Sequence, residues 1–148
     1  MISFIKKYYY KWKYRNYNKL TKFYTLNNIN VWAKIVHVYD GDTVHAVFSL
    51  PSSSTIYKYK LRLAHIDTPE LKSKNANEVK KANEAKKVVE DMILNKIVYL
   101  ELEGEDKYGR ILANIYINNI NLNQYLIENK YAYKYEGGTK IKFSKSSK

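Results

Sequence analysis

Two short segments of this sequence carry charged residues whose types and spacing could do chemistry. The segment LRLAHIDTPE contains Arg62, Asp67 and Glu70, and the segment YDGDT contains Asp42. Carboxylates ~4 Å apart repel one another by roughly 1 kcal/mol per pair in water and by about 4 kcal/mol near a protein surface. A hard divalent cation removes this repulsion, and ligation by oxygen alone suits Ca²⁺ or Mg²⁺. If strand ends bring these acids together, we expect them to hold such an ion.

Two arginines complete the set. Arg62 lies just before Asp67, and Arg110 ends the segment DKYGR. A guanidinium is a planar fork that grips phosphate, so a cation and two arginines aimed at one point suit a phosphodiester and its transition state. A further carboxylate can orient or deprotonate the attacking water. Alone, each motif is weak, because DGD is a common surface turn, DTPE a strand exit and KYGR a basic turn. The order and spacing of the whole set carry the prediction.

The sequence disfavours other metal chemistry. There is no cysteine, which excludes a disulfide framework and thiolate ligands. The three histidines, His37, His45 and His65, are not spaced as a zinc cluster. An EF-hand loop also fails, because Val44 and His45 stand where that loop needs an acid or Asn and then Gly.

The net charge of +12 is concentrated in two flanking arms. Residues 1–30 contain seven Lys or Arg and residues 137–148 contain four Lys, all without an acid, whereas residues 31–136 hold 15 basic and 14 acidic residues. Basic arms favour polyanions, either nucleic acid or acidic lipid headgroups, and the six tyrosines among the N-terminal cations suit stacking on unpaired bases. The alternative is the coding bias of an AT-rich genome, since the whole chain is rich in Lys, Asn, Ile and Tyr.

The hydrophobic pattern predicts the elements that must position the charged residues. Apolar alternation between turn residues predicts five strands, Val31–Tyr39, Thr43–Leu50, Ile56–Ile66, Lys96–Leu102 and Arg110–Ile117. Gly41, in the turn between the first two, is expected to take a positive φ. Helical spacing predicts one helix after an Asn75 cap and a second over Asn119–Lys130. This order predicts an α+β, mainly β fold, an OB-fold barrel of five strands with two helices, which often binds nucleic acid.

The charge distribution and the predicted strands divide the chain into three regions. Residues 1–28 form a basic, Tyr- and Lys-rich arm, residues 29–140 the barrel domain, and residues 141–148 a basic tail. No apolar run approaches the ~20 residues of a membrane span. The N-terminus reverses the order of a secretory signal, because the apolar MISFI precedes the charged KKYYYKWKYR. This order favours an intracellular over a secreted protein, while the sequence leaves the compartment open.

In combination, the motifs resemble the staphylococcal nuclease-like (thermonuclease) family. The resemblance runs from about Val31 to Lys140 and rests on VYDGDTV, RLAHIDTPE, DKYGR, INLNQYLIENKYAY and EGGTK. It implies an OB-fold core that cleaves DNA and RNA with Ca²⁺ and leaves 3′-phosphate and 5′-hydroxyl ends. The chain departs from the family in ending soon after EGGTK, so the final C-terminal helix is short or missing, and the N-terminal arm has no family counterpart.

The resemblance also implies a role for individual residues. Asp42 and Asp67 match the calcium carboxylates, and Thr68 matches the residue that gives a backbone carbonyl to the ion. Glu70 matches the acid that acts on the attacking water, as general base or as water orienter. Arg62 matches a phosphate-gripping arginine.

The remaining matches lie later in the chain. Arg110 matches the second phosphate-gripping arginine and is a candidate for stabilising the leaving group. Lys107 and Tyr108 match residues that contact a neighbouring phosphate. The tyrosine that covers the bound base is matched by Tyr133 or Tyr135.

The sequence thus predicts a monomeric, calcium-dependent endonuclease for DNA and RNA, acting on single-stranded or breathing regions without an obligate protein partner. The alternative is a catalytically silent OB-fold module that binds single strands by stacking and charge. Such a groove would gain from losing Asp42, Asp67 and Glu70, yet the sequence retains all three. A third interpretation, a membrane-surface protein, leaves the acids unexplained.

Overall fold

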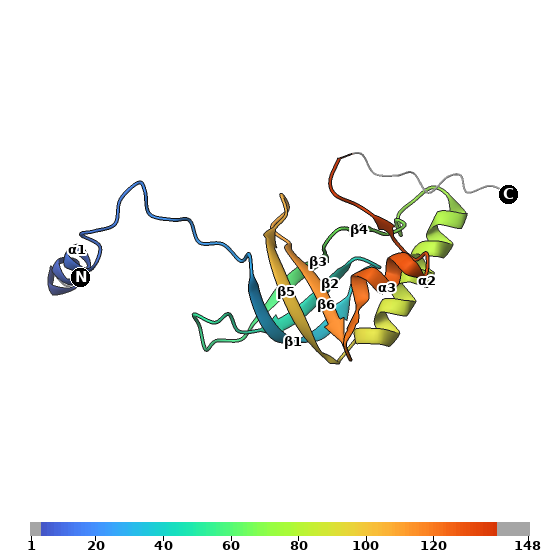
Figure 1. Cartoon of the computed structure of the whole chain (residues 1–148), viewed down its shortest axis with the longest axis horizontal. Helices are drawn as coiled ribbons and strands as arrows, with labels where there is room; N and C mark the ends of the chain where they lie inside the picture. The colour runs from blue at the N-terminus through green and yellow to red at the C-terminus, as the bar shows by residue number, and fades with distance from the viewer. Residues whose placement is uncertain (1–3, 139–148) are drawn as a thin grey trace.

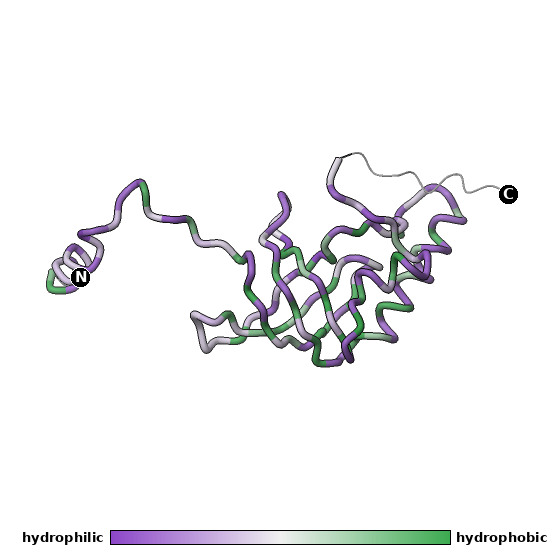
Figure 2. The backbone as a smooth tube through the Cα atoms, in the orientation of Figure 1, coloured by the Kyte–Doolittle hydropathy of each residue, from purple (hydrophilic) through white to green (hydrophobic). Residues whose placement is uncertain are grey.

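Alternating apolar side chains produce the strands at the centre of the fold. In β1 (Ile29–Val38), Val31, Ala33 and Ile35 are buried, while the residues between them are exposed. The computed structural model describes residues 4–138. Hydrophobic and hydrophilic residues alternate along its strands (Figure 2). The other strands are β2 (Thr43–Phe48), β3 (Tyr57–Leu63), β4 (Ile66–Asp67), β5 (Ile97–Glu105), β6 (Ile111–Ile117), β7 (Ile120–Asn121) and β8 (Tyr133–Lys134).

The five longer strands close into a barrel. Their order is β3-β2-β1-β5-β6, with β7 added at β6, and a parallel pairing of β3 with β6 closes the ring. The other pairings around the ring are antiparallel. The predicted fold class, an α+β and mainly β barrel of the OB type, is confirmed.

Two helices cover one side of the barrel (Figure 1). The helix α2 (Ala76–Ile93) begins at the predicted cap, where the Asn75 side chain accepts hydrogen bonds from the backbone N–H groups of Asn77 and Glu78. This cap satisfies two of the free N–H groups of the first turn. The helix α3 (Leu122–Glu128) is capped in the same way by Asn121, and both helices bury their apolar faces.

The predicted third strand is interrupted before its end. β3 ends at Leu63, and the chain turns at His65, whose φ is 60°, before β4. β4 then pairs with β8, so that Asp67 lies opposite Tyr133. This turn carries Asp67 and Thr68 away from the line of β3 and across one end of the barrel.

The prediction of a positive φ at Gly41 was wrong. Among residues 4–138, the glycines with positive φ are Gly104, Gly109, Gly137 and Gly138. Gly41 is needed for space instead, because a Cβ there would lie 3.0 Å from both the Ala85 Cβ and the Thr68 Cγ2. Its missing side chain lets the turn pack directly against α2 and the segment after β4.

The N-terminal arm contains a helix that the sequence analysis did not predict. The helix α1 (Phe4–Lys13) lies away from the barrel and has no buried residue (Figure 1). The arm joins the barrel at Leu26, which is buried, and at Asn28, whose N–H donates to the Leu102 carbonyl. None of the helices in residues 4–138 has the length and apolarity needed to cross a membrane. The predicted tail, residues 141–148, lies outside the described residues.

Candidate active site

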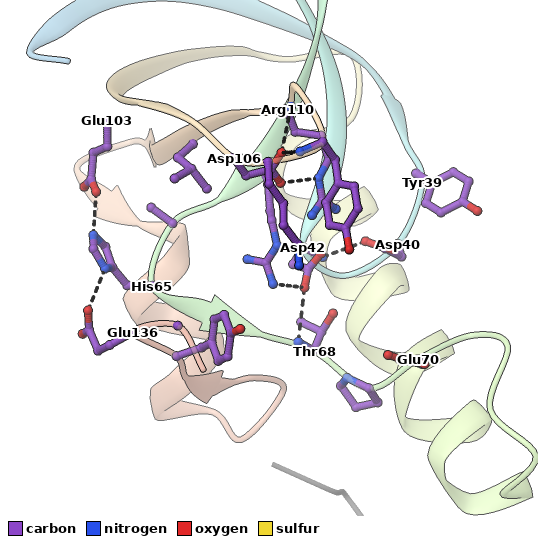
Figure 3. A pocket seen from close by; sticks show the side chains of 18 of the residues that line it. Tyr39, Asp40, Asp42, His65, Thr68, Glu70, Glu103, Asp106, Arg110 and Glu136 are labelled. Carbon is purple, nitrogen blue, oxygen red and sulfur yellow. Dashed lines mark hydrogen bonds and ion pairs between the residues drawn. The ribbon is translucent and has the colours of Figure 1, made fainter. Parts of the chain in front are cut away.

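A cavity of about 990 Å³ opens where the β1–β2 turn, the end of β3 and the β5–β6 turn meet (Figure 3). Most of the residues singled out from the sequence line it, namely Asp42, Arg62, Thr68, Glu70, Lys107, Tyr108, Arg110 and Tyr135. Four further carboxylates and a histidine of its wall were not singled out as site residues, namely Asp40, Glu103, Asp106, Glu136 and His65.

Arg62 connects the two carboxylates that the sequence predicts as metal ligands. Its Nη2 lies 3.3 Å from Asp42 Oδ2 and 3.1 Å from Asp67 Oδ1. Its Nη1 donates to the carbonyl oxygens of Leu63 and Ile66, at 3.1 and 2.8 Å. All three charged side chains are at least nine-tenths buried. Each charge is therefore compensated by several partners, which buried ions require.

The fold places these groups together through strand register. Thr43 pairs with Arg62 across β2 and β3, which sets Asp42 beside the guanidinium. Asp42 is fixed further by two donors, the Thr43 hydroxyl at 3.0 Å and the Thr68 N–H at 3.3 Å. Asp67 reaches the same point from β4, after the turn at His65.

Asp40 is a site residue that sequence reasoning missed. Burial and the neighbouring Asp42 carboxylate raise the pKa of Asp40 to about 6. Its side chain also accepts a hydrogen bond from the Asp42 N–H at 3.0 Å. The available signal was its place as the first acid of the DGD turn, two positions before Asp42.

The donor chemistry of this corner fits a hard cation. Asp40, Asp42 and Asp67 offer oxygen atoms, and the pKa of Asp40 is raised first by burial and then by repulsion from Asp42, which a cation would relieve. However, among residues 4–138 no three acid, histidine or cysteine side chains are grouped so as to hold a metal. The expected convergence of Asp42, Asp67 and Glu70 is therefore not seen. Two of these acids meet at Arg62, and Glu70 lies exposed in the cavity wall.

Arg110 is held on the wall by an acid four residues before it. Asp106 Oδ2 accepts from Arg110 Nε at 2.7 Å, and its Oδ1 accepts from the Arg110 N–H at 3.0 Å. Burial opposes ionisation of Asp106, but these hydrogen bonds outweigh it and lower the pKa of Asp106 overall. Arg110 Nη1 also donates to the Thr43 hydroxyl at 3.3 Å, so Thr43 connects Arg110 with Asp42.

The aromatic candidates occupy different positions. The Tyr108 ring lies beside both cations of its turn, 5.1 Å from Lys107 Nζ and 5.6 Å from the Arg110 guanidinium carbon. The Tyr135 ring lies 5.8 Å from the Arg62 guanidinium carbon and lines the cavity. Tyr133 is not among the cavity-lining residues of the described chain. Of the two tyrosines that the resemblance offers, Tyr135 is the one that lines the cavity.

Hydrogen bonds of His65 hold the segment that contains Tyr135 in place. Its Nε2 lies 2.6 Å from Glu103 Oε2, and its Nδ1 lies 3.1 Å from Glu136 Oε2. Burial lowers the pKa of His65, but hydrogen bonds to the two glutamates outweigh this and raise it overall. The His65 carbonyl also accepts from the Tyr135 N–H at 2.8 Å. These contacts hold the segment that follows β8, residues 135–138, in the wall of the cavity.

Comparison with known protein families identifies the family of this chain. The model of the family described as Staphylococcal nuclease homologue matches residues 60–147, more than half of the chain. The chain belongs to this family. The matched range includes Arg62, Asp67, Glu70 and Arg110, whereas Asp42 and the N-terminal arm precede it.

Several curated proteins resemble this staphylococcal nuclease homologue. An uncharacterized protein of Methanocaldococcus jannaschii is 32% identical over 91% of the chain and 72% of its own length. An uncharacterized endonuclease of Haemophilus influenzae is 32% identical over 70% of the chain and 52% of its own length. Endonuclease YncB of Bacillus subtilis is 29% identical over 68% of the chain and 48% of its own length. The chain thus spans about half the length of these two endonucleases.

Proposed function

We propose that this chain is a calcium-dependent endonuclease that hydrolyses DNA and RNA to 3′-phosphate and 5′-hydroxyl ends. Its family and its endonuclease-named relatives support nuclease activity in general. The observation that carries the proposal is the buried Asp42–Arg62–Asp67 group, which lies at one cavity with Glu70 and Arg110 on the walls. This is the set of residue types that metal-assisted phosphodiester cleavage needs.

The distribution of charge supports a bound cation. Six carboxylates line the cavity, at positions 40, 42, 70, 103, 106 and 136, and four lysine or arginine side chains line it, at positions 62, 72, 107 and 110. A phosphodiester entering alone would meet repulsion from these acids. Asp42, Asp67 and the backbone carbonyl of Thr68 would hold Ca²⁺. When bound, the ion supplies charge neutralisation and Lewis acidity at the phosphate.

The side chains of this chain would divide the remaining work. Arg110 Nη1 and Nη2 would bind the phosphate, because Asp106 already orients the guanidinium through Nε. Arg62 would contribute its charge from the cavity floor. Glu70 would accept the proton of the attacking water or orient that water. Lys107 and Tyr108 would hold the next phosphate, and Tyr135 would stack on the base.

The proposed bond changes balance as a hydrolysis. The water oxygen bonds to phosphorus while the bond from phosphorus to the 5′ oxygen breaks. The water proton passes to Glu70, and the 5′ oxygen leaves next to Arg110 and takes a proton from solvent. The phosphate stays on the 3′ oxygen, which gives the stated ends. Stacking on Tyr135 requires an unpaired base, so single strands and breathing regions would be preferred.

A cleavage assay with end analysis tests this proposal. The purified chain is incubated with supercoiled plasmid and with single-stranded DNA and RNA, in Ca²⁺ or in excess chelator. We expect nicking in Ca²⁺, none in chelator, and product 5′ ends that a polynucleotide kinase labels without prior phosphatase treatment. Full cleavage in chelator contradicts the calcium site. Binding of single strands without cleavage in Ca²⁺ supports the silent binding module instead.

A further inference from the structure

The helix α1 presents an apolar face that nothing in the described chain covers. Apolar and aromatic residues recur at helical spacing on this face, namely Phe4, Ile5, Tyr8, Tyr9 and Trp12. Phe4 and Ile5 are 76% and 81% exposed. The helix lies apart from the barrel, as Figure 1 shows, and has no buried residue.

The opposite side of α1 is basic. Its lysines, Lys6, Lys7, Lys11 and Lys13, fall between the turns of the apolar face, and no acid occurs before Asp40. The tyrosines on this side are engaged locally. Tyr10 and Tyr14 stack with ring centroids 5.6 Å apart, and Lys13 Nζ lies 5.9 and 6.0 Å from these two rings. Two rings of the apolar face also contact cations, since Lys13 Nζ lies 5.8 Å from the Tyr9 ring and the Arg15 guanidinium carbon lies 4.6 Å from the Trp12 ring. The most exposed side chains of that face are Phe4, Ile5 and Tyr8.

We propose that α1 binds an anionic lipid surface, with its apolar face in the interfacial region and its lysines at the headgroups. A helix that separates aromatic and aliphatic residues from lysines has the pattern of interfacial membrane helices, in which apolar burial and attraction to acidic lipids add. This goes beyond the proposed nuclease function and does not depend on it.

The distribution of apolar and basic side chains on α1 favours a lipid surface over nucleic acid as the binding partner. A groove for single strands interleaves cations with aromatic rings, so that phosphates and bases are met together. On α1 the rings of Tyr9 and Trp12 do contact cations, but the exposed Phe4 and Ile5 form an apolar patch that phosphates do not match, and Ile5 has no ring on which a base could stack. A duplex offers phosphates to the lysines and leaves the apolar face without a partner. A bilayer surface satisfies both faces at once.

Vesicle partitioning tests the proposal with the full chain. The probes are vesicles of phosphatidylcholine, pure or mixed with phosphatidylserine. The chain has two tryptophans, so a Trp32→Phe variant leaves Trp12 as the fluorescent reporter. We expect a blue shift of Trp12 emission and co-flotation with anionic vesicles, both weaker with pure phosphatidylcholine and in high salt. No partitioning to anionic vesicles would overturn the proposal.

A matched pair of substitutions separates lipid insertion from other binding. Phe4→Ser removes an apolar side chain from the face and is expected to weaken partitioning about tenfold. Phe23→Ser makes the same change at a 98% exposed position of the arm beyond α1, and no effect is expected. The double variant Lys6→Gln, Lys7→Gln should lose about fivefold per lysine. Thermal unfolding confirms that each variant still folds.

Three other outcomes would contradict the lipid proposal. Equal partitioning of Phe4→Ser and the parent means that the apolar face is not inserted. Quenching of Trp12 by DNA at concentrations where vesicles have no effect assigns the arm to nucleic acid. Concentration-dependent dimers that Phe4→Ser abolishes assign the face to a second copy of the chain.

Discussion

The arm and the cavity are both rich in cations and tyrosines, yet they hold these side chains in opposite ways. Arg62 is 8% exposed and donates to two carbonyls while pairing with two carboxylates. Arg15, two residues beyond α1, is exposed, and its side chain contacts the carbonyl and the ring of Trp12. The cavity fixes Arg62 and Arg110 before any ligand binds, whereas the cations of the arm are held by fewer contacts.

This difference suits two kinds of binding. Donors fixed in advance need no reorganisation during a reaction, which is what transition-state stabilisation requires. Exposed cations on α1 attract acidic surfaces in general, but they do not hold a bound group in one fixed geometry. Substitutions in the cavity should therefore change rate or stability strongly, while the same substitutions in exposed positions should change little.

The largest effect is expected at Glu70. Glu70→Gln removes the proposed proton acceptor but keeps the size of the side chain, so cleavage should slow on the order of 10²–10⁴-fold. Glu84→Gln on the exposed side of α2 is the matched control and should leave the rate unchanged. Single-turnover cleavage of a short oligonucleotide in Ca²⁺ measures both. A Glu70→Gln rate within about twofold of the parent assigns the proton transfer to another group.

The next effect is expected in stability. Arg62→Met leaves Asp42 and Asp67 buried without their shared partner, which typically costs ~3–5 kcal/mol of unfolding free energy. Urea unfolding in chelator measures this loss. If the two carboxylates hold Ca²⁺, added Ca²⁺ should return part of the lost stability. A variant as stable as the parent would show that the buried pairings contribute nothing net.

Arg110→Lys tests orientation separately from charge. Lysine keeps the charge but loses the fork that Asp106 orients, so turnover should fall on the order of 10²–10³-fold. Arg15→Lys makes the same change in the arm and should leave turnover on short oligonucleotides at the parent value. An active Arg110→Lys enzyme would mean that charge alone is sufficient at this position.

The smallest effect concerns Asp106. Its folded pKa is lowered from 3.8, so it contributes stability above that pH and loses it as pH falls through the folded pKa. Asp106→Asn should cost about 1 kcal/mol near pH 7, and this difference should shrink below about pH 4. Asp91→Asn, at an exposed pair with Lys87, should show almost no difference. A pH-independent loss at Asp106 would point to packing rather than ionisation.

The barrel could be predicted because its strands bury one face. Alternation in Val31–Ile35 and the Asn75 cap are local signals, and both agree with the structure. The turn at His65 is not a local signal, since non-glycine residues rarely take φ near 60° and the pairing of β4 with β8 stabilises it from far along the chain. The φ of Gly41 was misjudged for a similar reason, because contacts with Ala85 and Thr68 explain that glycine.

The site could be predicted as a set of residues but not as an arrangement. Motif order brought Asp42, Arg62 and Arg110 together, and the structure places all three in the cavity wall. Arg62 pairs with the acids instead of extending toward a phosphate. This pairing depends on the register between β2 and β3. The helix α1 was not predicted because tyrosine is a weak helix former and because the lysines were interpreted as part of a charged arm.

The calcium dependence of cleavage by an Asp42→Asn variant tests the central claim most directly. The substitution keeps the size of the side chain and removes one of the two charges that meet at Arg62. Asp91→Asn, outside the cavity, is the control. If Asp42 holds the ion, the Ca²⁺ concentration for half-maximal cleavage should rise at least about tenfold in Asp42→Asn and stay at the parent value in Asp91→Asn. An unchanged calcium midpoint in Asp42→Asn, with cleavage intact, would contradict the account.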